Sequence, residues 1–138
     1  VFLQARLEST RLPHKVFLPL EDRTILEHCM YALRDVPADV HALLTTSSGE
    51  LFFPEFATEY GFHVFVGDSA DVLSRFYHAA VRYQITHIIR ATADNPVVSA
   101  ELARQSLARI IGTGIEYSHF TGNPLGTGVE VFMFKHLR

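Results

Sequence analysis

Short apolar runs alternate along the chain with longer segments in which apolar residues recur every three or four positions. The longer segments predict helices at residues 24–36, 49–60, 71–84 and 99–111. The short runs predict strands at residues 1–4, 40–46, 63–66, 87–90, 116–119 and 129–134. Strands that alternate with helices are typical of a mainly parallel sheet with helices on both faces. The pattern therefore predicts an α/β fold.

Three local signals indicate where helices begin. Thr24 and Glu27 stand three apart, which is the spacing of a capping box. Pro54 must lie in the first turn of its helix or mark a later start, because proline cannot continue the hydrogen bonding of a helix interior. Asp71 stands where a negative charge interacts favourably with the helix dipole.

The composition is that of an ordinary globular domain. The 138 residues fit one domain, 48% of them are hydrophobic, and the formal net charge is -3. This charge argues against nucleic acid as a partner, and no apolar run approaches the roughly 18–20 residues that cross a membrane. The single cysteine, Cys29, falls in an apolar helical pattern, so we expect a buried thiol in a cytoplasmic protein. Because the last residues resemble the start of another element, we expect a domain truncated at its C-terminus.

Cations and hydroxyls gather in the loop that follows the first predicted strand. Arg6, Arg11 and Lys15 stand there with Ser9 and Thr10 between them. Ligands of open α/β sheets bind outside the carboxyl ends of the strands, and Arg and Lys both suit phosphate oxygens. The loop is therefore a candidate seat for a polyphosphate. The alternative is an ordinary solvated basic loop.

Two further clusters follow predicted strands. Residues 67–75 carry Asp68, Asp71 and Arg75, and the chain after the fourth strand delivers Asp94. Asp94 suits Mg²⁺, which binds one or two carboxylates together with substrate phosphates, although an Asp before a proline can also simply cap a turn. Glu130 is a candidate second carboxylate, with a solvated surface position as the alternative.

Several familiar motifs are missing from the sequence. It contains no Walker-type GxxxxGK[ST], no GxGxxG and no HExxH. It also lacks an Asp-x-Asp triplet, which argues against a metal-dependent glycosyltransferase.

Seven segments together resemble the cytidylyltransferases that activate acidic sugars. These segments are residues 4–15, 24–28, 45–47, 66–68, 71–77, 90–96 and 129–132. The resemblance is to relatives of the CMP-sialic acid and CMP-Kdo synthetases, and most of all to the spore coat polysaccharide biosynthesis protein F group. It implies a glycosyltransferase-A-like nucleotidyltransferase fold. The implied reaction transfers CMP from CTP to a sugar acid and releases pyrophosphate, for surface polysaccharide biosynthesis.

The resemblance also implies roles for individual residues. Catalysis would depend on Arg6, Lys15 and Asp94. Mg²⁺ would be held by Asp94, and a homodimer is the implied assembly. Glu130 is the only nearby substitute for a second metal ligand, because Gly128 stands where many relatives have an acidic residue. The phosphates of the nucleotide would be bound by Arg6, Ser9, Arg11 and Lys15. The pocket for the base would be lined by Leu3, Ala5 and Thr45. Two further arginines, Arg75 and Arg90, would lie near the nucleotide or the acidic substrate.

The chain departs from the family pattern at three positions. His14 and Ala93 stand where the family usually has glycine, and Gly128 stands where many relatives have an acidic residue. These departures favour an alternative hypothesis, in which the protein is a nucleotide-binding or assembly module that has lost catalysis.

Overall fold

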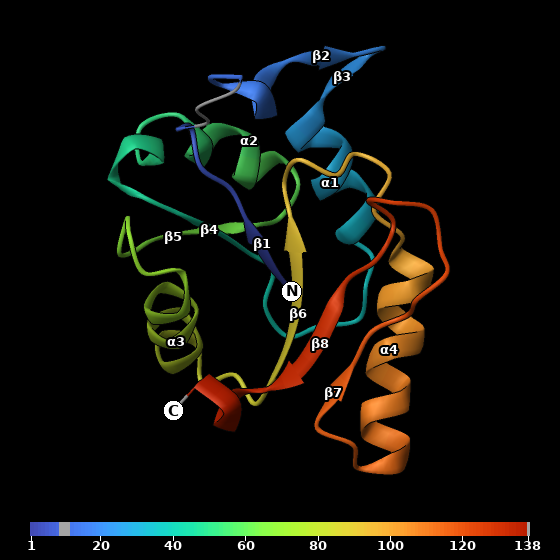
Figure 1. Cartoon of the computed structure of the whole chain (residues 1–138). Coiled ribbons are helices and arrows are strands. Elements are labelled where there is room, and N and C mark those ends of the chain that lie inside the picture. The colour runs from blue at the N-terminus through green and yellow to red at the C-terminus, as the bar shows by residue number, and fades with distance from the viewer. Residues whose placement is uncertain (9–11, 138) are drawn as a thin grey trace.

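A six-stranded sheet forms the centre of the protein in this computed structural model, which describes residues 1–8 and 12–137 (Figure 1). Its strand order is β5-β4-β1-β6-β8-β7. Strands β5, β4, β1 and β6 are parallel, whereas β8 runs antiparallel to β6 and β7 antiparallel to β8. The predicted mainly parallel sheet is confirmed. The strands are β1 (Phe2–Gln4), β4 (Ala42–Thr45), β5 (His63–Val66), β6 (His87–Thr92), β7 (Tyr117–Ser118) and β8 (Glu130–Met133).

Four α-helices connect the strands, each close to its predicted position. They are α1 (Ile25–Leu33), α2 (Phe53–Glu59), α3 (Val72–Tyr83) and α4 (Ala100–Thr113). The capping box at Thr24 forms, and Asp71 caps α3 through the backbone N–H of Ser74. Helix α2 begins four residues later than the predicted position 49, because Pro54 occupies its first turn.

Short elements fill several connections. The 3-10 helices are η1 (Lys15–Phe17), η2 (Ser47–Gly49) and η3 (Phe134–Leu137). A small hairpin of β2 (Pro19–Leu20) and β3 (Arg23–Thr24) leads into α1. The sequence pattern did not predict this hairpin, since each strand has only two residues and no apolar alternation.

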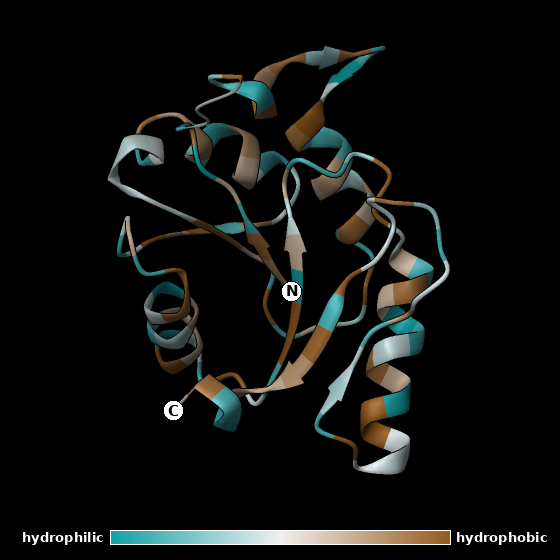
Figure 2. Cartoon of the chain, in the orientation of Figure 1, coloured by the Kyte–Doolittle hydropathy of each residue, from teal (hydrophilic) through white to brown (hydrophobic). Residues whose placement is uncertain are grey.

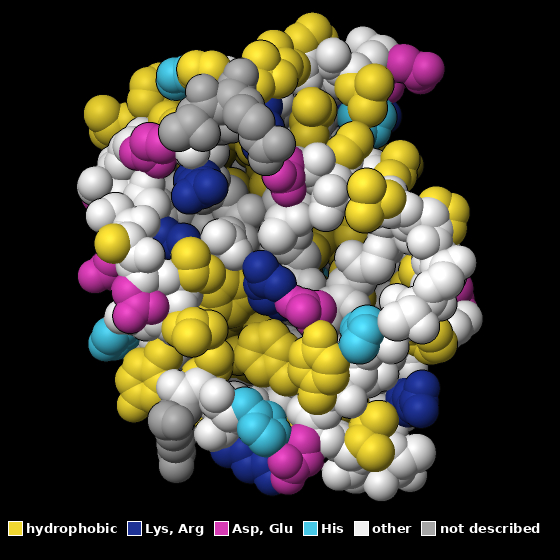
Figure 3. Space-filling model, viewed as in Figure 1, with side chains coloured by type: hydrophobic (Ala, Val, Ile, Leu, Met, Phe, Trp, Pro, Cys, Tyr) yellow, Lys and Arg dark blue, Asp and Glu magenta, His cyan; other side chains and the backbone are white. Residues whose placement is uncertain are grey.

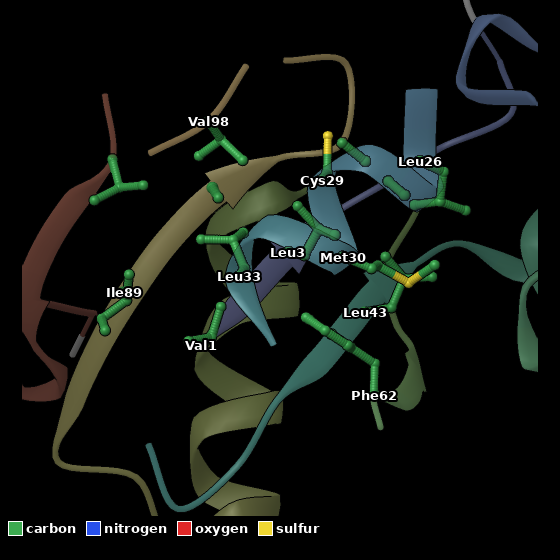
Figure 4. Close-up of a cluster of buried hydrophobic side chains, with 14 of the residues drawn as sticks. Val1, Leu3, Leu26, Cys29, Met30, Leu33, Leu43, Phe62, Ile89 and Val98 are labelled. Atoms are coloured by element: carbon green, nitrogen blue, oxygen red, sulfur yellow. The ribbon is translucent and has the colours of Figure 1, made fainter. Parts of the chain in front are cut away.

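Helices α1, α2 and α4 cover one face of the sheet. Leu3 of β1 and Leu43 of β4 are paired in register and point to this face, where they belong to one buried cluster (Figure 4). Leu26, Met30 and other residues of α1 fill the same cluster. Cys29 is buried there too, as predicted, and burial raises the pKa of its thiol to about 12. The ribbons are correspondingly hydrophobic where these helices meet the sheet (Figure 2).

Helix α3 covers only part of the opposite face. Phe2 and Ile88, early in β1 and β6, pack with Phe76 and Ala79 of α3 in a second buried cluster. Further along the same strands the side chains on this face become polar. In Figure 1 α3 lies low in the view, whereas β6 ends near the top, so the carboxyl ends of these strands extend beyond the helix.

Within the described residues, no helix is long and apolar enough to cross a membrane.

Candidate nucleotide-binding site

A cavity of about 270 Å³ lies at the carboxyl ends of β1 and β6. On the same face of the molecule, a band of hydrophobic side chains lies below the middle, and charged side chains of both signs lie above it and at the bottom edge (Figure 3). The residues lining the cavity come from β1 and the loop after it, η1, α3, β6 and the loop after β6, and they are Gln4, Ala5, Arg6, Glu8, Lys15, Val16, Val72, Arg90, Thr92 and Asp94.

Lys15 and Asp94, which are 79 positions apart in sequence, form an ion pair in this cavity. Lys15 Nζ donates to Asp94 Oδ2 at 2.5 Å. Burial tends to raise the pKa of Asp94, but the hydrogen bonds from Lys15 and Thr92 and the charge of Lys15 outweigh it and leave the pKa below its usual value. Asp94 is therefore a carboxylate at neutral pH.

The backbone around Lys15 explains how this side chain reaches the cavity. The N–H of His14 donates to the carbonyl of Leu7, which closes the loop between them. His14 has a φ of 55° and caps η1 in the left-handed conformation that glycine adopts most readily. A glycine at this position in related proteins would thus serve the same turn.

The loop that carries Asp94 is tied to its surroundings on both sides. Asn95 Nδ2 donates to Thr92 Oγ1 at 2.8 Å, and the buried Sγ of Cys29 donates to the carbonyl of Asn95 at 3.2 Å. The Asp94 carboxylate is therefore presented by a loop that is fixed to both β6 and α1.

Arg90 lines the cavity from β6 and is paired with Glu130 of β8. Arg90 Nη1 donates to Glu130 Oε2, and the hydroxyl of Tyr117 donates to Glu130 Oε1 at 2.9 Å. Burial tends to raise the pKa of Glu130, but Arg90 and Tyr117 hold it below its usual value. The structure thus places Glu130 in a charged network with Arg90, and Glu130 does not line this cavity.

Gln4 carries an oxygen that has no partner among the described residues. Its Oε1 is buried, and the residue lines the cavity. Buried polar atoms are nearly always hydrogen-bonded in proteins. An unpaired oxygen in a cavity that also contains the Asp94 carboxylate and the Thr92 hydroxyl matches the oxygen ligands that Mg²⁺ prefers.

The family profile described as cytidylyltransferase matches residues 1–138, which is the whole chain. The chain belongs to the cytidylyltransferase family. It is 32% identical over 135 residues to the spore coat polysaccharide biosynthesis protein SpsF of Bacillus subtilis, covering 94% of this chain. The chain spans 56% of the length of the curated relatives that it matches.

Solved structures show the same fold. A cytidylyltransferase from Leptospira borgpetersenii superposes with a TM-score of 0.89 at 29% identity, covering 99% of this chain and 60% of that one. The CMP:2-keto-3-deoxy-manno-octonic acid synthetase complexed with CTP superposes with a TM-score of 0.77 at 12% identity, covering 99% of this chain and 74% of that one. The fold expected from the sequence resemblance is therefore confirmed.

The structure brings together four of the nine nucleotide-binding residues expected from the resemblance. Ala5, Arg6, Lys15 and Arg90 line the cavity with Asp94. Ser9 and Arg11, also expected to bind phosphates, lie outside the described residues. The sequence argument assigned no site role to five cavity residues, namely Gln4, Glu8, Val16, Val72 and Thr92. Gln4 and Thr92 could have been found from strand alternation, because Gln4 falls two positions after Phe2 and Thr92 two positions after Arg90, on the same face of the sheet.

Leu3 and Thr45, expected in the base pocket, do not line this cavity. Both are fully buried, and Leu3 points to the opposite face of the sheet with the apolar cluster under α1. The Oγ1 of Thr45 has no partner among the described residues and lies where a side chain on Gly49 would collide with it. A role for these two residues in binding the base stays a prediction.

Arg75 is a buried residue of α3 and does not line the cavity. Only 1% of its surface is exposed, and its Nη1 donates to the carbonyl of Asp68 at 2.7 Å, which ties α3 to the loop before it. Its Nε and Nη2 have no partner among the described residues. Burial and then the nearby charge of Arg6 lower the pKa of Arg75.

A second cavity of about 250 Å³ adjoins the first on the β8 side. The two cavities share Arg90 and Thr92, and the second is also lined by His119, Gly128 and Glu130 among others. An added Cβ on Gly128 would meet nothing within 4 Å, so the position has room for a side chain. Among the described residues, no group of three or more His, Cys, Asp or Glu side chains is placed to hold a metal ion.

Proposed function

We propose that this protein transfers CMP from CTP to an acidic sugar and releases pyrophosphate, in the biosynthesis of a surface polysaccharide. The observation that carries the proposal is the convergence of Arg6, Lys15 and Arg90 on one cavity that also contains Asp94. Two named relatives support it. One is a protein of spore coat polysaccharide biosynthesis, and the other is a CMP-sugar acid synthetase in complex with CTP.

The chemistry suits this set of residues. A sugar hydroxyl would attack the α-phosphorus of CTP, the bond to the bridging oxygen would break, and pyrophosphate would leave. Transfer of this kind depends on positioning and charge neutralisation more than on a protein nucleophile. Arg6 and Lys15 would neutralise the triphosphate, since both are cations at the cavity wall.

A divalent metal fits the remaining residues. Asp94 offers a carboxylate, Gln4 a buried unpaired oxygen and Thr92 a hydroxyl in the same cavity. Asp94, Gln4 and Thr92 would hold Mg²⁺ there, and the ion would supply positive charge that offsets the negative charge of the triphosphate. Lys15 would then exchange its bond to Asp94 for one to phosphate. The second cavity, with Arg90 and His119 in its wall, is the proposed site of the acidic sugar.

The first test is a thermal melt with CTP and Mg²⁺. Ligand at about 100 times its Kd stabilises a protein by about 2.7 kcal/mol, so we expect the Tm to rise by several degrees. Asp94→Ala should remove most of the Mg²⁺-dependent part of this rise. Asp35→Ala is the matched control, because Asp35 pairs with Arg34 in an ion pair outside the cavity. No shift with any nucleoside triphosphate would contradict the proposal.

The alternative function is a nucleotide-binding or assembly module without turnover, favoured by Gly128 and by the engagement of Glu130 with Arg90. A pyrophosphate-release assay of CTP against a panel of sugar acids separates the two. Binding of CTP without pyrophosphate from any acid supports the module, whereas pyrophosphate release by the wild type supports the enzyme.

A further inference from the structure

Three strands contribute to one charged network between the two cavities. Arg90 of β6 and Glu130 of β8 are directly opposite each other in the antiparallel register. Tyr117 of β7 is opposite Phe132, two residues from Glu130 on the same face. Side chains at directly opposite and diagonal positions are within reach across a sheet. The network is therefore fixed by the backbone register of three strands.

Both carboxylate oxygens of Glu130 are engaged in this network. Oε2 accepts from Arg90, and Oε1 accepts from the Tyr117 hydroxyl. Arg90 lines both cavities, whereas Glu130 lines only the second one and not the cavity that contains Asp94. The carboxylate is thus directed at the guanidinium, and the guanidinium is directed at the boundary between the two cavities.

We propose that Glu130 is a positioning residue for Arg90 and not a metal ligand, and that Tyr117 fixes Glu130 in this task. This inference rests on the proposed function, since it assigns Arg90 to the bound nucleotide. An arginine side chain has many rotamers, and a fixed carboxylate that accepts a hydrogen bond from the guanidinium confines the side chain to one of them. The pair replaces the expectation that Asp94 and Glu130 share one metal ion.

The experiment compares Glu130→Gln, Tyr117→Phe and Arg90→Met with the wild type in three measurements. The first is the side-chain Nε–H NMR signal of Arg90 without ligand, which reports whether the guanidinium is held. The second is the affinity for Mn²⁺ by electron paramagnetic resonance, with Asp94→Asn as the reference for a lost metal ligand. The third is the affinity for CTP with Mg²⁺ by calorimetry.

Glu130→Gln should release the Arg90 signal, weaken CTP binding by about tenfold and leave Mn²⁺ affinity within about twofold. Tyr117→Phe should change the first and third measurements in the same direction by about twofold to threefold. In the Arg90→Met background, Glu130→Gln should have no further effect, because a positioning residue acts only through its partner. Glu116→Gln is the matched control, since Glu116 pairs with Lys135 outside both cavities.

Two results would overturn the inference. One is a loss of Mn²⁺ affinity in Glu130→Gln comparable to that in Asp94→Asn. The other is an Arg90 signal or a CTP affinity that Glu130→Gln leaves unchanged. If the wild type binds no CTP, the proposed function fails, and the NMR and Mn²⁺ measurements still decide the role of Glu130 because neither needs a nucleotide.

Discussion

The two faces of the central sheet are built on the same strands but differ in how they are covered. Three helices cover one face, and its side chains, such as Leu3 and Leu43, form a continuous apolar cluster. On the other face α3 packs only on the early part of β1 and β6, and Gln4, Arg90 and Thr92 remain open to the cavity. The closed face supplies stability, and the open face presents polar groups to a ligand.

The largest expected effect is on stability, and it comes from comparing alanine substitutions at Leu3 and Gln4, which are neighbours in β1 and lie on opposite faces of the sheet. Leu3→Ala should lower the free energy of unfolding by about 3 kcal/mol, because it leaves a hole in a closely packed cluster. Gln4→Ala should cost less than about 1 kcal/mol and instead weaken the binding of CTP with Mg²⁺. Urea unfolding and calorimetry check both variants.

Two outcomes would break this comparison between the faces. Equal destabilisation by the two variants would show that Gln4 is a core residue. A Leu3→Ala variant that keeps its stability and loses CTP affinity would show that Leu3 lines the base pocket, as the family resemblance implies.

A smaller effect on the free energy of unfolding is expected when either of two histidines is replaced by glycine, and the sign of the effect differs between them. His14→Gly should raise the free energy of unfolding by about 0.5 kcal/mol, because glycine adopts the left-handed backbone at this turn without strain. His28→Gly should lower it by about 1 kcal/mol, because His28 lies inside α1. Thermal melts of the two variants measure both shifts, and a loss of stability in His14→Gly would contradict strain at the site loop.

The smallest effect is the pH dependence of the pair that spans the open site. Interactions in the folded protein hold the pKa of Asp94 below its usual value of 3.8. The pair therefore stabilises the fold at pH values above about 4, and this contribution is lost as the pH falls through the lowered pKa. It should be at most about 0.5 kcal/mol, because the Asp94 side chain is 40% exposed.

Urea unfolding of the wild type and Asp94→Asn between pH 7 and pH 2.5 tests this contribution. The two stability curves should converge at low pH. A difference that grows as the pH falls would contradict the depressed pKa.

Most of the fold follows from the sequence because its signals are local. The capping box at Thr24 formed as predicted, and Asp71, expected only to interact with the helix dipole, is the N-cap of α3; each depends on contacts within one helical turn. The start of α2 was wrong by four residues, because the sequence left two positions open for Pro54 and the structure takes the later one. The β2–β3 hairpin was missed because two-residue strands carry no periodicity.

The site was only partly predictable for a different reason. The pairing of Lys15 with Asp94 joins two loops brought together by parallel strands, and the rule on carboxyl ends predicted it in outline. The pairing of Arg90 with Glu130 depends on the register between β6 and β8, which the sequence pattern does not specify. The partner of Glu130 could therefore not be foreseen, and its assignment to the metal stays a prediction that the Mn²⁺ measurement tests.

The side chains of β6 point alternately to the two faces of the sheet. This alternation limits which insertions and deletions the gene can accept within the strand. Arg90 and Thr92 point to the site, whereas Ile89 and Ala91 lie in the core. Deleting or inserting one codon within β6 would exchange the two sets, burying the guanidinium and exposing the apolar side chains. Evolution can therefore substitute residues in this strand singly, but it cannot change the strand's length without losing ligand recognition and the folded core together.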